Sequence, residues 1–243
     1  MLFNSLEFIV FFAPVVLLVY AWLKRKQLAD LAEVWLVLSS FFFYAWWQPR
    51  YLPLLLGSIG VNYLIGRALK RATRHGSRKS LLAFGVAANL GLLAYFKYAG
   101  FLTSTLRGVG MGWVPSMEVI LPLAISFFTF QQIAYVVDCY RGKVNELSLR
   151  SYSLFVSFFP QLIAGPIVHH SEMGPQFDRN RDRSLRMEDV GIGLIIFCVG
   201  LGKKVLIADQ LALAATPVFA AADGGGTVTL VEAWCGALSY SLQ

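Results

Sequence analysis

Hydrophobic stretches separated by short polar stretches dominate the chain, and they predict an all-α protein that crosses a membrane several times. A helix needs about 20 mostly apolar residues to cross the hydrocarbon layer of a bilayer. The candidate stretches are Leu6–Leu23, Val34–Trp47, Leu52–Ile65, Leu81–Tyr98, Val119–Val137, Phe155–Val168, Ile192–Ala208 and Leu230–Gln243. We therefore expect a polytopic helical membrane protein with about seven to eight hydrophobic segments.

The stretch Phe155–Val168 differs from the others because helix-breaking residues interrupt it. Pro160-Gln161 and Gly165-Pro166 lie inside it, and His169-His170 follow it. Each proline removes a backbone donor and clashes with the preceding helical turn. Broken backbone at membrane depth is tolerated only where it is buried in protein or lines a wet cavity. The stretch therefore predicts an internal site within the membrane domain.

Composition supports the membrane assignment. The chain is 57% hydrophobic and only 14% charged, whereas soluble domains carry about 25% charged residues. The net charge of +7 is concentrated in residues 67–79, which hold six Lys or Arg and no acid. A short basic loop between hydrophobic segments marks the cytoplasmic side and is suited to contact with anionic lipid. No aromatic side chains alternate with these charges, so we exclude nucleic acid as a partner.

Lys and Arg also predict the orientation of the chain. Lys24–Lys26 and residues 67–79 belong on the cytoplasmic side, which makes the N-terminus extracytoplasmic. A full crossing by residues 155–168 would place loop 169–189 outside. Because that loop contains four arginines, we favour a re-entrant segment that keeps it inside. The expected location is the bacterial inner membrane.

Polar residues gather in the stretch 121–142. Gln131, Tyr135 and Asp138 lie at i, i+4 and i+7 and share one helix face, whereas Gln132 continues a second row of polar positions. Such groups are expensive in lipid and usually face the protein interior. Hydrogen bonding between helices is the simpler interpretation, and lining of an internal site is the alternative. Asp138 and Arg141, at i and i+3, are candidates for a structural ion pair.

Histidines and cysteines offer little chemistry. A histidine can act as a base near neutral pH, but His169 and His170 follow a Gly-Pro break, which favours a loop or tunnel-rim position. The three cysteines (Cys139, Cys198 and Cys235) lie far apart, so we expect no metal site and interpret them as buried small hydrophobic residues.

Six motifs in order carry a resemblance to a known family. They are Phe42-Phe-Tyr-Ala-Trp-Trp47, Tyr95-Phe-Lys-Tyr-Ala99, Leu121-Pro-Leu-Ala-Ile-Ser-Phe127, Asp138-Cys-Tyr-Arg-Gly142, Phe159-Pro-Gln-Leu-Ile-Ala-Gly-Pro166 and Lys203-Lys-Val-Leu-Ile-Ala-Asp209. The chain resembles the N-terminal half of the membrane-bound O-acyltransferases (MBOAT). Within that family it is most similar to the bacterial alginate O-acetyltransferases and more distantly similar to the D-alanyl transferases.

The resemblance implies a multi-helix membrane enzyme without a bound cofactor. It would pass an acyl group from a cytoplasmic donor such as acetyl-CoA to an extracytoplasmic polysaccharide or a partner transferase, with a periplasmic acetyltransferase-type protein as the expected partner. The family's catalytic histidine is expected beyond Gln243. We therefore interpret residues 1–243 as the N-terminal part of a single transmembrane domain, and expect this part alone to be inactive.

The site residues implied by the resemblance line a substrate tunnel and do not perform the proton transfer. The candidates are Gln131, Gln132, Tyr135, Gln161, His169 and His170. One position departs from the family pattern, since relatives commonly carry Arg where this chain has His169. That departure puts a donor-phosphate role at this position in doubt.

Other functions remain open at this stage. Transfer of D-alanyl groups or acyl transfer to a lipid would use the same fold, and a noncatalytic assembly subunit is a further possibility. A secondary transporter could also contain broken helices with midplane polar groups. The sequence shows neither an inverted pair of interrupted helices nor an intramembrane acid pair, which argues against a transporter.

Overall fold

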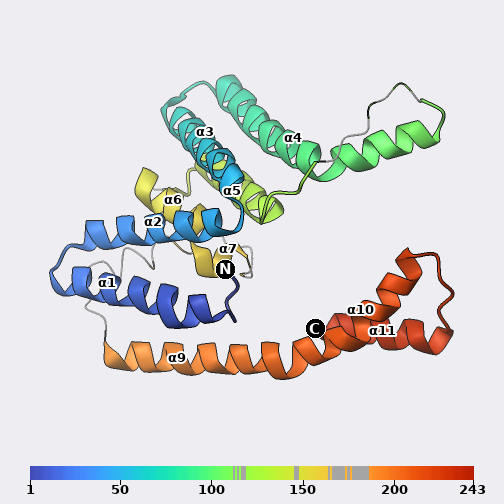
Figure 1. Ribbon diagram of the computed structural model, residues 1–243. Coiled ribbons are helices and arrows are strands. Elements are labelled where there is room, and N and C mark those ends of the chain that lie inside the picture. The colour runs from blue at the N-terminus through green and yellow to red at the C-terminus, as the bar shows by residue number, and fades with distance from the viewer. Residues whose placement is uncertain are drawn as a thin grey trace. The chain divides into compact units, whose positions relative to one another are not determined.

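The computed structural model describes residues 1–111, 113, 115, 119–144, 148–163, 165, 173, 176 and 186–243 of the chain. Over these residues the chain forms helices joined by turns, and no strand is present (Figure 1). The prediction of an all-α fold is confirmed. The chain divides into two compact units, one spanning Phe12–Ser184 and one combining Leu2–Phe11 with Leu185–Gln243.

The described residues of the first unit form seven α-helices. They are α1 (Ala13–Arg25), α2 (Ala29–Trp47), α3 (Leu52–Arg71), α4 (His75–Gly108), α5 (Ile125–Tyr140), α6 (Leu149–Ser157) and α7 (Phe159–Leu162). Short turns separate most of them: Gln27 adopts a positive φ of 57° between α1 and α2, and a 3₁₀ turn (η2, Pro49–Tyr51) precedes α3. Prolines in the first turns of α1 and α3 suit positions whose backbone N–H has no helical partner.

Six helices of this unit contribute to its core in the described residues. Side chains from α2, α3, α4, α5, α6 and α7 form one hydrophobic cluster, in which Tyr44, Leu55, Phe128 and Tyr152 are essentially inaccessible to solvent. Figure 1 shows α3, α4 and α5 side by side. An ion pair also fixes α6 to α2, because Arg150 lies 2.8 Å from Asp30 and 2.5 Å from Glu33.

The second unit contains a long helix followed by a helical hairpin. Its elements are α9 (Met187–Gly202), a π-helical turn η3 (Lys203–Ala208), α10 (Asp209–Asp223) and α11 (Leu230–Leu242), together with most of the N-terminal π-helical turn η1 (Glu7–Phe12). Thr229 and Glu232 form a capping box that starts α11, since each side chain accepts a hydrogen bond from the other residue's backbone N–H. Gly236 allows α11 to approach α10 closely, because a Cβ there would lie 2.7 Å from Val218.

Five helical segments in the described part of the chain are long and apolar enough to span a membrane. They are Glu7–Arg25, Ala29–Trp47, Pro49–Arg71, His75–Gly108 and Met187–Asp223. The protein is thus a multi-pass helical membrane protein. The other three predicted stretches contain shorter helices, namely α5, the α6–α7 pair and α11.

Several predicted boundaries were wrong, and the stretch expected at Leu81–Tyr98 is part of the longer helix α4 (His75–Gly108). The stretch expected at Val119–Val137 becomes helical only at Ile125, because Ala124 has a left-handed φ of 56°. At 1.5 Å per residue the 16 residues of α5 extend about 24 Å, which is shorter than the roughly 30 Å hydrocarbon layer. The stretch expected to end at Ala208 instead continues through η3 and α10 to Asp223. The π-helical hydrogen bonding of η3 does not alter the hydropathy pattern, so it could not be predicted from the sequence.

Candidate functional site

Four polar side chains from three helices meet inside the first unit. The group, called the amide cluster below, consists of Ser58 and Asn62 on α3, Asn89 on α4 and Gln132 on α5. The Oε1 atom of Gln132 accepts hydrogen bonds from Ser58 Oγ at 2.5 Å and from Asn62 Nδ2 at 2.6 Å. Asn89 Nδ2 donates to Asn62 Oδ1 at 2.6 Å. Polar groups that would be costly in lipid therefore hold α3, α4 and α5 together.

The amide cluster leaves hydrogen-bonding capacity unused. The Nε2 atom of Gln132 is buried and has no hydrogen-bond partner among the described residues, and the same holds for Oε1 of the neighbouring Gln131 and Oγ1 of Thr129. A buried polar group without a partner costs about 1–3 kcal/mol. Such groups call for a further partner, such as water or a polar part of a substrate.

Tyr135 lies one turn farther along α5. Its ring stacks on that of Tyr152 from α6, with ring centroids 3.9 Å apart and an interplanar angle of 28°. Gly66 on α3 makes room for it, since a Cβ at position 66 would lie only 2.8 Å from the Tyr135 hydroxyl oxygen. Tyr135 is thus fixed between two helices by one aromatic contact and one glycine.

Asp138 and Arg141 mark the end of α5. Asp138 is buried on the last turn of the helix, whereas Arg141 follows the helix and is exposed. The ion pair proposed between them stays a prediction. At this end of α5, Arg78 of α4 donates a hydrogen bond to the backbone carbonyl of Tyr140.

The interrupted segment breaks where α6 ends. Phe158 has a ψ of 107°, and the chain then resumes as the single turn α7 with Pro160 in its first turn. Proline is tolerated in the first turn of a helix because the backbone N–H groups there have no helical hydrogen-bond partner. The Phe159 N–H donates to the Ser40 hydroxyl of α2 at 3.3 Å, and the Phe159 ring packs on Phe12 and Phe43. The predicted interruption is confirmed, and a buried serine supplies the backbone partner that the break requires.

Gln161 lies on a different helix from the members of the amide cluster. It is half-buried on α7, which packs on α2 and α6, whereas Gln132 is hydrogen-bonded to Ser58 and Asn62 of α3. His169 and His170 lie outside the described residues. Whether residues 155–168 cross the membrane or re-enter also depends on residues outside that set.

Sequence reasoning missed three members of the amide cluster. Ser58 and Asn62 are spaced i, i+4 within the predicted stretch Leu52–Ile65, and Asn89 lies in the stretch Leu81–Tyr98. The rule applied to α5, that polar residues inside an apolar span face the interior, would have selected them as well. Their convergence on Gln132, however, depends on how the helices pack.

The cysteines require one correction. Cys139 is buried as expected, but Cys198 and Cys235 are exposed on α9 and α11, so their interpretation as buried residues was wrong. Within the described residues, no three His, Cys, Asp or Glu side chains come together in a way that could hold a metal ion. The polar groups that the amide cluster offers are amides and a hydroxyl.

Comparisons with known proteins place these features in a family. The family model described as "MBOAT, membrane-bound O-acyltransferase family" matches residues 8–222. A peptidoglycan O-acetyltransferase of Helicobacter pylori is 42% identical over 269 residues, covering 100% of this chain and 50% of that protein. A probable alginate O-acetylase AlgI of Pseudomonas aeruginosa is 36% identical over 249 residues, covering 100% of this chain and 46% of that protein.

A more distant relative matches only part of the chain. The teichoic acid D-alanyltransferase of Lacticaseibacillus rhamnosus is 28% identical over 131 residues, covering 53% of this chain and 30% of that protein. No solved structure gives a significant match. The chain spans about half the length of the curated relatives that it matches over its full extent. The family model covers most of its residues, so the chain belongs to the membrane-bound O-acyltransferase family.

Proposed function

We propose that the protein containing this chain transfers an acyl group, specifically acetyl, from a cytoplasmic donor such as acetyl-CoA to an extracytoplasmic polysaccharide or a partner transferase. Similarity over the whole of this chain to about half of each of two kinds of O-acetyltransferase supports this reaction class. The observation within the fold that carries it is the amide cluster, a set of buried and half-buried polar groups in which Gln132 Nε2 has no hydrogen-bond partner among the described residues. A cluster of this kind suits a polar substrate passing through a membrane domain.

The reaction is an acyl transfer between a thioester and a hydroxyl group. A base removes the proton of the acceptor hydroxyl, and the oxygen attacks the thioester carbonyl. The tetrahedral oxyanion collapses as the carbon–sulfur bond breaks, and the leaving thiolate takes up a proton. The base is the histidine that the family resemblance places beyond Gln243. Within this chain, amide N–H groups such as that of Gln132 are suited to hold a carbonyl or phosphate oxygen.

Six residues are proposed to line the substrate path: Gln131, Gln132, Tyr135, Gln161, His169 and His170. Gln131, Gln132 and Tyr135 are supported by their burial on α5, and Gln161 by its place in the interrupted segment. His169 and His170 rest on the resemblance alone. Asp138 and Arg141 are proposed to have a structural role.

The acceptor is proposed to be a polysaccharide. The relatives named for peptidoglycan and alginate modification both act on polymers of this class, although the two polymers differ. Transfer of D-alanyl groups is the second candidate, supported by the partial similarity to the teichoic acid D-alanyltransferase. A periplasmic acetyltransferase-type partner would connect the membrane reaction with the polymer.

The proposed location is the bacterial inner membrane with the N-terminus outside. A single cysteine introduced as Asn180→Cys, in a background without native cysteines, tests the re-entrant arrangement. Labelling by a membrane-impermeant maleimide only after the cytoplasmic side is opened would support it. Labelling from outside intact cells would refute it.

Acetyl transfer is tested with the full-length protein in membrane vesicles supplied with radiolabelled acetyl-CoA. Label should pass to a purified polysaccharide acceptor, and Gln161→Ala and His169→Ala should each lower the transfer rate at unchanged protein level. A wild-type rate in both variants would remove these residues from the substrate path. Labelled D-alanine on the acceptor without labelled acetate would favour the second candidate, and uptake of a solute without thioester cleavage would favour a transporter.

A further inference from the structure

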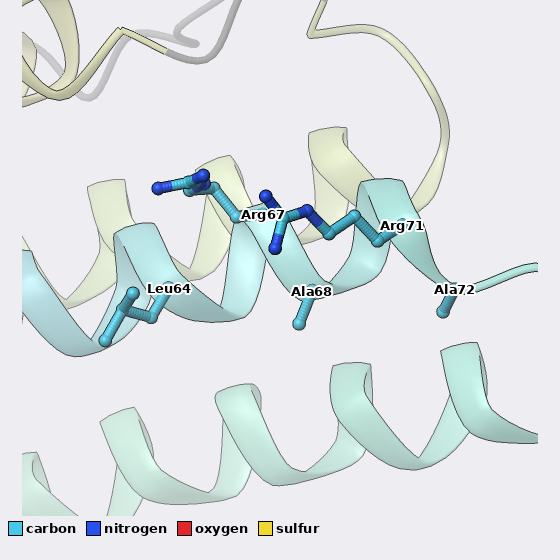
Figure 2. A pocket seen from close by; sticks show the side chains of 5 residues that line it. All are labelled: Leu64, Arg67, Ala68, Arg71 and Ala72. Atoms are coloured by element: carbon cyan, nitrogen blue, oxygen red, sulfur yellow. The ribbon is translucent and has the colours of Figure 1, made fainter.

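An open groove runs along the last two turns of α3. Leu64, Arg67, Ala68, Arg71 and Ala72 line a volume of about 460 Å³ there. Figure 2 shows the Arg67 and Arg71 side chains on one side of the α3 ribbon, while Leu64 and Ala68 point to the other side. The groove thus combines two guanidinium groups with an apolar wall, and it lies at the basic end of the spanning segment Pro49–Arg71.

Aromatic contacts fix the position of Arg67. Its guanidinium lies over the ring of Tyr63, 5.8 Å from the ring centroid. Tyr63 in turn stacks against Tyr152, which stacks against Tyr135 in the core. Because the supporting rings are packed, Arg67 loses less freedom on binding a ligand than a fully solvated arginine would.

The positive charges of the groove have no acidic residues near them in the sequence. Residues 67–79 carry six Lys or Arg and no Asp or Glu. Among the described residues, no carboxylate forms an ion pair with Arg67 or Arg71. Two arginines spaced i, i+4 on a helix are neighbours, so their like charges repel unless an anion lies between them. The groove is therefore electrostatically suited to an anion.

The shape of the groove selects the kind of anion. Arginine presents a planar fork of N–H donors that matches the oxygens of a phosphate group. Leu64, Ala68 and Ala72 offer an apolar surface beside that fork, which a small inorganic ion would leave unused. Basic pockets on transmembrane helices at the cytoplasmic side bind the head groups of anionic lipids.

We propose that this groove is a binding site for the phosphate group of an anionic phospholipid, with Arg67 and Arg71 as its ligands and the Leu64–Ala72 surface against the lipid chain. The site is separate from the amide cluster and does not depend on the proposed acyl transfer. It would anchor the cytoplasmic end of α3 to its surrounding lipid.

Native mass spectrometry of the full-length protein in neutral detergent tests the proposal with phosphatidylglycerol and phosphatidylcholine as probes. The double variant Arg67→Gln/Arg71→Gln should weaken phosphatidylglycerol binding by roughly tenfold or more, on the scale expected for two basic residues. The matched control Arg74→Gln/Lys79→Gln removes the same charge outside the groove and should change binding less than about threefold.

The outcomes separate the sources of phosphate. Preferential binding of phosphatidylglycerol over phosphatidylcholine, lost only in the groove variant, supports the proposal. Equal losses in the groove and control variants would overturn it, because the attraction would then come from net charge alone. Full displacement of the lipid by millimolar inorganic phosphate would also overturn it, in favour of a soluble phosphate ligand. Unchanged thermal unfolding of both variants verifies that folding is preserved.

Discussion

The two units of this chain bury their residues to very different extents. In α5 of the first unit nine of 16 residues are buried, including Thr129, Gln131, Gln132 and Asp138. In α9 of the second unit none of the 16 residues is buried, and Ile192, Leu194, Ile195 and Ile196 are exposed. Both helices are apolar in sequence, and α5 also carries a buried polar side chain, that of Gln132, which is hydrogen-bonded to α3. The contrast shows that α5 forms part of the interior of its unit, whereas the surface of α9 is accessible to lipid or to other protein.

The largest effect is expected from Gln132→Leu. The substitution keeps the side-chain size similar but removes the acceptor shared by the half-buried hydroxyl of Ser58 and the buried amide of Asn62. We expect the free energy of unfolding to fall by about 1–3 kcal/mol. The measurement is thermal unfolding in detergent, followed through the reactivity of buried Cys139 after Cys198 and Cys235 are replaced by serine.

Phe130→Leu is the control for that variant, because Phe130 lies on the same helix and is 45% exposed. It should unfold close to the wild-type temperature. Equal stability of Gln132→Leu and Phe130→Leu would show that the amide cluster contributes nothing to packing, and the contrast between the two units would lose its physical basis.

A smaller loss is expected from Gly66→Ala. The new Cβ would lie 2.8 Å from the Tyr135 hydroxyl oxygen, and the stacked Tyr152 ring limits how far Tyr135 can move. Overpacking costs about 1–3 kcal/mol, partly offset by the roughly 1 kcal/mol better helix propensity of alanine. The same unfolding assay should therefore detect a net destabilisation of about 1 kcal/mol.

Gly60→Ala on the same helix provides the matched comparison, since no atom lies within 4 Å of its added Cβ. It should be neutral or slightly stabilising. If Gly66→Ala is as stable as Gly60→Ala, the close approach of α3 to Tyr135 is not a constraint on the fold.

The smallest effect is expected from Ile195→Ala on α9. Ile195 is 66% exposed, so truncation removes little packing within the chain. The free energy of unfolding in detergent should change by less than about 0.5 kcal/mol. A loss above about 2 kcal/mol, the size seen for buried Ile, would show that α9 packs against protein in solution and would remove the distinction between the units.

Most helices could be predicted from the sequence because apolar runs are a local property. The stretches Val34–Trp47 and Leu52–Ile65 lie within α2 and α3, and the break near Pro160 follows from proline chemistry. The late start of α5 could not be predicted, since the left-handed Ala124 lies in an apolar run that fits a helix equally well. Loop contacts stabilise that turn: Tyr51 donates to the Ile120 carbonyl, and Gln48 accepts from the Leu123 N–H.

The candidate site could be predicted in part, because the polar residues of a single helix are also a local property of the sequence. Gln131, Gln132 and Tyr135 were recognisable because polar residues in an apolar helix must turn inward. Gln132 lies 74 positions from Ser58 and 70 from Asn62, and Asn62 lies 27 positions from Asn89. No local pattern links residues at such separations.

By itself the sequence determined the class of protein, most of its helices, the interrupted segment and the polar character of α5. Hydropathy and proline geometry act over a few residues, so they can be recognised before the chain folds. The tertiary structure alone decided that Ser58, Asn62, Asn89 and Gln132 meet, that Gly66 admits Tyr135, and that Ser40 receives the free N–H of Phe159. These contacts depend on the packing of helices distant in sequence, where each buried polar group must find a partner.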